Sequence, residues 1–588
     1  MRKELLFYDR VRLFNRNFGG LSMKIAVLSN VNIDGIINKL RKLLKDAEFY
    51  LPPFNTYAIE MLNKNSELYD FKPDSIFLYL DGYSLFDKYI NDPFLYKDFS
   101  RIGSMEARKL MDIIENFMEN MPNSVIILNT IVIPPKNVST LLEFNTNYTP
   151  TLLEYSFNER ISKLKIEKRI SGLAICPWRN MVLTVGYDNI YDRRYWYLGR
   201  VPLNMSGLEM LAKCFVKTYE TLKTKPKKVI VLDLDNTLWG GIIGEDGIDE
   251  IKLGEDGIGK AYRDFQKLLL AMKHRGVLLT IASKNNENDV KEVFDKHPMM
   301  VLKWNDFVVK KINWLQKSEN IKSIAEELNL GIDSFVVIDD NPFERMEIKS
   351  AFPSIIAPEF PEDPAILPEW FIGVVEDYFS TTIITEEDKK RSDIYLAETK
   401  RKTLLKTAQS FENFLKQLEM VAIITINDEL MIPRQAQLTQ RTNQFNLTTR
   451  RYNEKDIERF IKDDKYIVYN LELIDKFGSN GIVGLIIVSL DDKKAFIDTF
   501  LMSCRIIGRR VEDAFMGFVL RDLKKKGIKK VFGEYIPTKK NKLVSDVYEK
   551  LGFELIETKE DGSKLYKIEV DENIKPMPEW VKVEVRKR

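Results

Sequence analysis

The segment Val229–Gly241 constrains this chain more than any other, because a β-branched run in it ends in two closely spaced carboxylates. The Val- and Ile-rich run predicts a buried parallel strand. Asp233 and Asp235 are two residues apart, so they lie on the same side of the chain where that strand ends. Two such carboxylates repel unless a cation lies between them or one holds a proton, and Mg²⁺ prefers hard oxygen ligands. The segment predicts a magnesium site in an α/β domain, unless it is an ordinary strand end with solvated acids.

Polar residues also follow the next apolar segments along the chain. The apolar run Val277–Ala282 is followed by Ser283. A helical pattern begins at Lys317, and a third apolar run ends at Asp339 and Asp340. This order of motifs resembles the haloacid dehalogenase (HAD) superfamily of aspartate-nucleophile phosphotransferases. The strings LDLDNTLWGG, IASKN and VIDDNPFER are similar to its FkbH-like branch, which is associated with loading a glyceryl unit onto an acyl carrier protein.

The HAD resemblance implies a role for each of these polar residues. Asp233 would attack phosphorus, and Asp235 would carry the proton to the leaving group and then activate the next nucleophile. Ser283 and Lys317 would bind the phosphoryl oxygens. The implied substrate is a small phosphorylated acyl compound, 1,3-bisphosphoglycerate or a similar acyl phosphate. The implied Mg²⁺ ligands are Asp233, Asp235, Asp339 and Asp340.

The first part of the chain predicts a separate α/β domain. Strand and helix patterns alternate from residue 23 to 224, which is typical of a parallel sheet covered on both faces. This region resembles the SGNH hydrolases, with Ser29 at the place of the nucleophile and Asn129 after a later strand. The region contains no histidine, so Ser29 lacks an imidazole base, and we expect a scaffold or recognition module rather than a hydrolase. Residues 1–22 are either a leader or an extra helix, and the start is either Met1 or Met23.

The HAD-like domain is expected over residues 225–360, with a linker over 361–380. The Gly-rich segment between the first motif and the first helix is too short for a large cap domain. A site without a cap stays open to a bulky substrate, such as a group held by a carrier protein.

Residues 381–588 predict an α+β domain that resembles the GNAT acyltransferases. The string Arg505–Arg510 is similar to their pyrophosphate loop, although Arg510 replaces its final small residue. The string QLTQRTNQFN, which begins at Gln437, is specific to the FkbH-like branch. The resemblance implies CoA or phosphopantetheine as ligand, and Tyr548 as general acid. The implied cofactor-binding residues are Arg505, Gly508, Arg509, Arg510 and Asn541. Together with nearby lysines such as Lys540, the arginines are expected to attract an acidic carrier protein.

Composition excludes several classes of protein. The formal charge of +2, from 89 basic and 87 acidic residues, does not favour nucleic acid as a partner. No apolar run approaches the ~20 residues that span a bilayer, and the N-terminus lacks a signal-peptide core. The chain has 588 residues, which predicts three or four domains.

The three cysteines lie far apart, so we expect neither a metal site nor a disulfide framework from them, but a reduced, cytoplasmic protein. Cys176 and Cys214 lie in apolar surroundings and are expected in the core. Cys504 lies beside arginines, which lower the pKa of a thiol. It is therefore either an acyl relay or a small buried apolar side chain.

Two other functions remain compatible with the sequence. The chain could be a plain Mg²⁺-dependent phosphatase whose last third is structural. It could also be an acyl-CoA-dependent transferase in which the HAD-like domain is regulatory.

Overall fold

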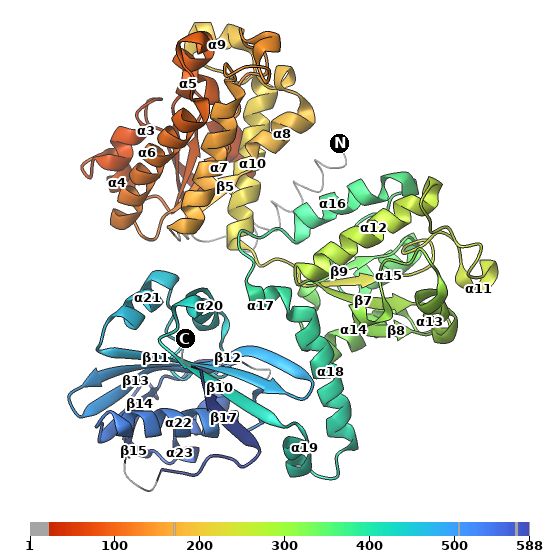
Figure 1. The fold of residues 1–588 in the computed structure, drawn as a ribbon, viewed down its shortest axis with the longest axis vertical. Helices are drawn as coiled ribbons and strands as arrows, with labels where there is room; N and C mark the ends of the chain where they lie inside the picture. Colours follow the sequence, from red (N-terminus) through yellow and green to blue (C-terminus); the bar gives the residue numbers. More distant parts are fainter. Residues whose placement is uncertain (1–22, 169, 171, 504–505, 571–573, 587–588) are drawn as a thin grey trace. The chain divides into compact units, whose positions relative to one another are not determined.

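A computed structural model describes residues 23–168, 170, 172–503, 506–570 and 574–586. The chain divides into two compact units, Met1–Lys225 and Pro226–Arg588, coloured red to yellow and yellow-green to blue in Figure 1. Within the described residues, no helix has the length and apolar character needed to cross a membrane.

The first unit is built on a parallel sheet with strand order β2-β1-β3-β4-β5, the flavodoxin-like doubly wound order. Alternate residues of its strands pack against opposite layers, as the period of two requires. Ile25 and Phe77 pack with α2 and α10, whereas Ala26 and Ile76 pack with α6 and α7. The strands are β1 (Met23–Ser29), β2 (Ala47–Tyr50), β3 (Ser75–Tyr79), β4 (Val125–Asn129) and β5 (Leu173–Cys176). The helices are α2 (Ile36–Leu43), α3 (Tyr57–Leu62), α4 (Glu67–Phe71), α5 (Gly82–Asn91), α6 (Phe99–Asn120), α7 (Thr151–Glu167), α8 (Trp178–Val185), α9 (Arg193–Gly199) and α10 (Met205–Lys223).

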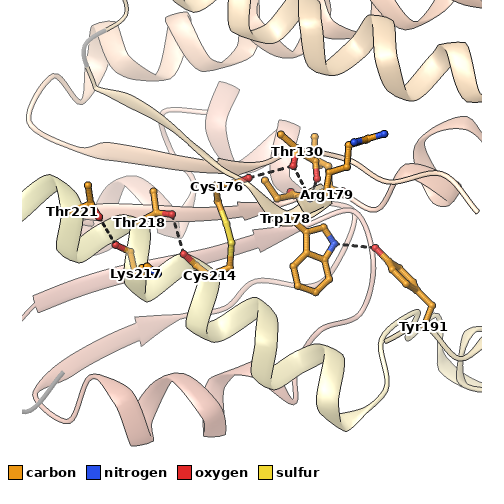
Figure 2. Close-up of a disulfide and its surroundings, with 11 residues drawn as sticks. Thr130, Cys176, Trp178, Arg179, Tyr191, Cys214, Lys217, Thr218 and Thr221 are labelled. Carbon is orange, nitrogen blue, oxygen red and sulfur yellow. Dashed lines mark hydrogen bonds between the residues drawn. A yellow bond between two sulfur atoms is a disulfide. The ribbon is translucent and has the colours of Figure 1, made fainter. Parts of the chain in front are cut away.

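A disulfide joins the end of β5 to α10 in this unit (Figure 2). Cys176 and Cys214 are both buried, as expected, but the expectation that the cysteines form no disulfide is wrong. The two thiols are 38 residues apart, and only the packing of α10 against the sheet brings them together. Disulfides are rare in reducing compartments. The cysteines therefore do not indicate a reduced, cytoplasmic protein.

This bond predicts a definite thiol count. The chain contains three cysteines, so protein unfolded without reductant should show one reactive thiol, that of Cys504. After reduction it should show three. Titration with a thiol reagent in denaturant measures both values. Three reactive thiols in protein purified under air and unfolded without reductant would contradict the bond.

The first half of the second unit is a four-stranded parallel sheet of order β8-β7-β6-β9, which is the 3-2-1-4 order of the Rossmann fold. The strands are β6 (Val229–Leu232), β7 (Leu278–Ser283), β8 (Phe307–Ile312) and β9 (Phe335–Ile338). The helices are α11 (Ile243–Asp246), α12 (Gly257–His274), α13 (Glu287–Lys296), α14 (Lys317–Leu328), α15 (Pro342–Ala351) and α16 (Leu367–Tyr378). Helix α16 lies inside the segment expected as a linker and packs on α12, with the rings of Phe371 and Phe265 5.1 Å apart.

The last part of the chain is an eight-stranded mixed sheet of order β15-β16-β14-β13-β12-β11-β10-β17. Its strands are β10 (Met420–Ile426), β11 (Tyr466–Asp475), β12 (Gly478–Asp491), β13 (Lys494–Met502), β14 (Lys530–Tyr535), β15 (Glu554–Thr558), β16 (Lys564–Glu569) and β17 (Val581–Val585). The helices are α17 (Glu386–Lys389), α18 (Arg391–Thr407), α19 (Phe411–Gln417), α20 (Ile432–Arg441), α21 (Glu454–Lys462), α22 (Val511–Lys525) and α23 (Val547–Lys550). The α/β multidomain fold class with an α+β domain at the end is confirmed.

Candidate active site

The carboxyl ends of three neighbouring strands bring the predicted catalytic residues to one edge of the second unit. Leu232, the last residue of β6, pairs with Ile338 at the end of β9 and with Ile281 near the end of β7. Asp233 and Asp339 follow directly, and the Asp233 amide donates to the Ile338 carbonyl. The strand order reverses between β6 and β9, which is where open α/β sheets bind ligands.

Asp233, Asp339 and Asp340 form a carboxylate cluster at this edge that could hold a metal ion. One carboxylate oxygen from each lies within 4.8 Å of the others. Three hard oxygen donors at this separation fit Mg²⁺, which takes few protein carboxylates and completes its shell with water and substrate oxygens. The Asp235 carboxylate, expected as a fourth ligand, is not part of the cluster because other donors hold it.

Lys317, the first residue of α14, lies between the carboxylates. Its Nζ is 3.0 Å from Asp233 and 2.5 Å from Asp339, and the residue is only 3% exposed. Burial by itself would lower the pKa of Lys317, but the two carboxylates raise it above its ordinary value. Burial, followed by repulsion from Asp233, raises the pKa of Asp339 to about 6. The Lys317 ammonium therefore offsets the free-energy cost of burying the carboxylates of Asp233 and Asp339.

Asp235 is positioned by three hydrogen bonds. Its carboxylate accepts from Trp239 Nε1 at 3.0 Å, from the Ile243 amide at 3.1 Å and from Asn285 Nδ2 at 2.9 Å. Burial raises its pKa, although these bonds oppose the shift. A carboxyl group with a raised pKa, two residues from Asp233, suits proton transfer to and from a leaving group.

Two polar residues without an assigned role complete the site. Asn285 is 2.9 Å from Asp235 and 3.3 Å from the hydroxyl of the buried Ser283 through the same Nδ2 atom. Thr237 accepts from the Asp340 amide at 3.2 Å and lies 3.4 Å from an Asp340 carboxylate oxygen. Both residues lie in the strings that carry the HAD resemblance. The Asn285–Asp235 and Thr237–Asp340 contacts join the ends of different strands, so the register of the sheet defines them.

Exposed apolar side chains lie near the site on the loop before α14 and on α15. Trp314 is 70% exposed and precedes Lys317, and Phe343 is 76% exposed and lies at the start of α15 after Asp340. Both elements touch the segment after β7: Trp314 Nε1 is 3.4 Å from Asn286, and Glu344 pairs with Lys284 at 2.6 Å. We call the exposed residues Trp314, Leu315, Phe343 and Met346 the rim.

The segment between Asp235 and α12 holds only the four-residue helix α11. No cap domain therefore covers the rim from this position, as the sequence predicts.

In the first unit, the side chain of Ser29, which lies where SGNH hydrolases keep their nucleophile, makes a structural contact. Ser29 is 5% exposed, and its Oγ accepts from the Val31 amide at 3.1 Å. The Asn129 side chain pairs with both backbone groups of Leu80. A cavity of about 660 Å³ lies beside the loops after β4 and β5. Its lining includes Lys136, Tyr187, Tyr191, Arg193, Arg194 and Asn204, and neither Ser29 nor Asn129.

Two aromatic side chains fix Tyr191 in the lining of this cavity. Its hydroxyl accepts from Trp178 Nε1 at 2.9 Å (Figure 2). The Tyr187 ring stacks on the Tyr191 ring at 4.2 Å.

The residues predicted to bind a cofactor in the C-terminal part have mixed positions. Arg509 is buried and pairs with Glu398 at 2.9 Å and with Asp475 at 3.5 Å, so it cannot attract a carrier from the surface as expected. Arg510 is exposed and pairs with Asp513 at 2.5 Å. Gly508 is exposed and has φ of 87°, a conformation that favours glycine. Cys504 and Arg505 lie outside the described residues.

The two remaining candidates, Asn541 and Tyr548, are buried. Asn541 is fully buried, and its side chain bonds to three backbone groups and accepts from the Tyr535 hydroxyl at 3.4 Å. Tyr548 is 1% exposed, and its hydroxyl has no hydrogen-bond partner among the described residues. Burial raises the pKa of Tyr548 above its ordinary value. Its role as a general acid stays a prediction.

Comparisons with known proteins support the α/β part of this description. No protein-family model and no curated protein matches the chain. Among solved structures, the N-terminal part of the protein BF1531 from Bacteroides fragilis, containing a phosphatase domain complexed with Mg, is 26% identical, with a TM-score of 0.55. That match covers 64% of this chain and 99% of the other.

Two further solved structures match a smaller part of the chain. The ribosomal-protein-S18-alanine N-acetyltransferase from Escherichia coli is 16% identical with a TM-score of 0.21, covering 26% of this chain and 99% of its own. Ard1 from Thermoplasma volcanium is 19% identical with a TM-score of 0.21 and the same coverages. These TM-scores are too low to support an inference. The chain is therefore similar, over 64% of its length, to a protein that contains a phosphatase domain.

Proposed function

We propose that this chain is an Mg²⁺-dependent enzyme of the HAD type that releases phosphate from 1,3-bisphosphoglycerate, or a similar acyl phosphate, and loads the glyceryl group onto the thiol of an acyl carrier protein. The cluster of Asp233, Asp339 and Asp340 around Lys317 carries the proposal. The similarity to a phosphatase-containing protein complexed with Mg supports it.

The first half of the reaction removes the phosphate ester. The Asp233 carboxylate attacks phosphorus and forms an aspartyl phosphate, while Asp235 gives its proton to the leaving alkoxide. Asp235 then takes a proton from water, which attacks the same phosphorus and releases phosphate and free Asp233. Ser283 and Lys317 orient the phosphoryl oxygens and offset their charge. Asp233, Asp339 and Asp340 would hold Mg²⁺, and the bound ion would neutralise charge on the phosphoryl group.

The second half forms the thioester. A thiolate attacks the acyl carbon of the acyl phosphate, the carbon–oxygen bond to the second phosphate breaks, and that phosphate leaves with the bonding electrons. The thiolate belongs either to the pantetheine arm of the carrier or to Cys504 as a relay, which then passes the acyl group to the carrier.

A protein-bound substrate is supported by the rim. The described segment between Asp235 and α12 forms no cap domain, and side chains as exposed as Trp314 and Phe343 lie on the loop before α14 and at the start of α15. Exposed apolar side chains that gather around a site are typical of protein–protein contacts. We propose that the carrier docks on the rim, in place of the arginines that the sequence suggested.

We propose that the first unit is a recognition module rather than a hydrolase. Its support is the structural use of Ser29 and Asn129, together with the nearby cavity that they do not line.

Intact-mass measurement of the carrier tests the function. The full chain is incubated with Mg²⁺, 1,3-bisphosphoglycerate and a carrier bearing its pantetheine arm. The expected result is a carrier that gains the mass of one glyceryl group, with phosphate released. Phosphate release without any change in carrier mass would reduce the function to that of a plain phosphatase.

The rim predicts a separation of two activities. The double variant Trp314→Ser with Phe343→Ser should load the carrier at least about tenfold more slowly, because losing two exposed anchors of an interface costs more than 1.4 kcal/mol. Phosphate release from a small phosphate ester should change less than about twofold, because neither side chain belongs to the metal cluster. Rates of loading and of phosphate release measure the two activities.

The matched control is Ile372→Ser, which removes a 48%-exposed apolar side chain on α16. It should leave carrier loading unchanged. Equal loss of both activities in the rim variant would contradict docking at the rim.

A further inference from the structure

The mixed sheet of the C-terminal part opens between two of its central strands. The parallel strands β13 and β14 pair from Lys494 with Lys530 to Ile497 with Gly533, and no pair follows. Strand β13 nevertheless continues to Met502. Strands that separate inside a sheet leave backbone donors and acceptors that need other partners.

A segment of the same chain fills this gap. The Leu447 amide donates to the Phe500 carbonyl of β13 at 3.0 Å, and the Leu447 carbonyl accepts from the Ile536 amide, just beyond β14, at 2.8 Å. The Met502 amide donates to the Phe445 carbonyl at 2.9 Å. Residues 445–447 are thus bonded to both strands, as an inserted strand would be.

The inserted segment is part of the core. Leu447 is fully buried and Phe445 is 4% exposed, with its ring 5.4 Å from the ring of Phe500. Asn541 fixes the segment: its Nδ2 donates to the Asn446 carbonyl at 3.0 Å and to the Ile536 carbonyl at 2.9 Å. Its Oδ1 accepts from the Thr538 amide at 2.7 Å. The Tyr535 hydroxyl donates to the same Oδ1 at 3.4 Å.

The next residues bind the same part of β13. Thr448 Oγ1 donates to the Asp498 carbonyl at 2.9 Å. Arg450 donates to the same carbonyl at 3.0 Å and forms ion pairs with Asp498 and Glu534. The backbone of β13 where the strands separate is therefore used by residues 445–450.

The fold class implies CoA, but these residues do not fit it. The pantetheine arm is an extended chain with two amides, and such a chain binds a sheet by pairing with free backbone groups. The groups that face the gap, on Asp498, Phe500, Met502 and Ile536, already have partners. Arg509 in the expected pyrophosphate loop is committed to Glu398 and Asp475.

We propose that residues 445–447 take the place of a ligand in this sheet, so that the C-terminal domain is a closed module that does not bind acyl-CoA. This inference concerns a different domain from the phosphate chemistry and does not depend on it. It removes acyl-CoA as the acyl donor and leaves the acyl phosphate as the activated group.

Hydrogen exchange of the full chain, followed by mass spectrometry with and without millimolar CoA or acetyl-CoA, tests the proposal. Peptides that contain Leu447, Met502 and Ile536 should exchange at least about a hundredfold more slowly than exposed amides. Neither ligand should change that rate, and calorimetric titration should detect no binding. Saturable binding of either ligand would overturn the proposal, whether or not the segment loses protection. Fast exchange at Leu447 without ligand would overturn it as well.

Asn541→Ala provides a matched perturbation, because it removes the bond to the Asn446 carbonyl of the segment together with the bonds to Ile536 and Thr538. Exchange in the peptides with Leu447 and Ile536 should accelerate at least about tenfold. Asn120→Ala, which changes an exposed hydrogen bond at the end of α6, should leave them unchanged. Equal exchange in the Asn541→Ala variant and the unchanged protein would overturn the role of Asn541 in holding the gap closed.

Discussion

The variant Asp233→Asn is expected to release phosphate at least about a thousandfold more slowly than the unchanged protein, because an amide oxygen is a poor nucleophile toward phosphorus. The same change removes one of the three carboxylates of the metal cluster. Asparagine keeps the shape of the side chain, so the sheet around β6 should stay folded. Rates of phosphate release at saturating Mg²⁺, together with circular dichroism, measure both effects.

Asp249→Asn is the matched control for this variant. Asp249 is an exposed acid on the segment between β6 and α12, outside the cluster. Its replacement should leave the rate within about twofold of the unchanged protein, as is usual for surface positions. Undiminished phosphate release by Asp233→Asn, or by the unchanged protein in excess EDTA, would contradict the proposed chemistry.

The variant Lys317→Met is expected to destabilise the metal-free protein by about 3–5 kcal/mol, because it leaves buried carboxylates without their cation. The side chain keeps its length, so the loss comes from charge and not from a cavity. Added Mg²⁺ should restore part of the stability, since it binds the folded cluster and not the unfolded chain. Urea unfolding in EDTA and in Mg²⁺ measures both effects.

Lys284→Met is the control for the loss of a lysine near the site. Lys284 pairs with Glu344 at the partly exposed mouth, where an ion pair contributes about 0–1 kcal/mol. Equal destabilisation by the two variants, or a Lys317→Met protein whose stability does not respond to Mg²⁺, would contradict the account of the cluster.

The sequence by itself predicted which polar residues meet at the carboxyl edge of the β6 sheet. Asp233, Ser283 and Asp339 each lie at or directly after an apolar strand, and in a parallel sheet the ends of such strands meet at one edge. Local pattern therefore determined both the fold of this part and the place of its chemistry. It did not predict β8, whose last residues are lysines and an isoleucine, or the packing of α16 on α12.

Contacts between segments far apart in the chain were decided only by the tertiary structure. Cys176 and Cys214 gave no spacing signal, and they meet because α10 lies across the end of β5. Arg509 belongs to a basic loop, for which the sequence predicts an exposed charge. Its guanidinium is instead buried, because it forms ion pairs with Asp475 and Glu398 from other elements.

The sequence around Phe445 and Leu447 shows no strand pattern. It fills a gap that exists only because β13 and β14 separate after Ile497 and Gly533. Periodicity records which face of an element is buried, but not which distant backbone or charge will satisfy a buried polar group. The sequence by itself thus determined which strand ends carry the candidate site. The tertiary structure decided which distant residues pair with Cys176, Arg509 and the segment 445–447.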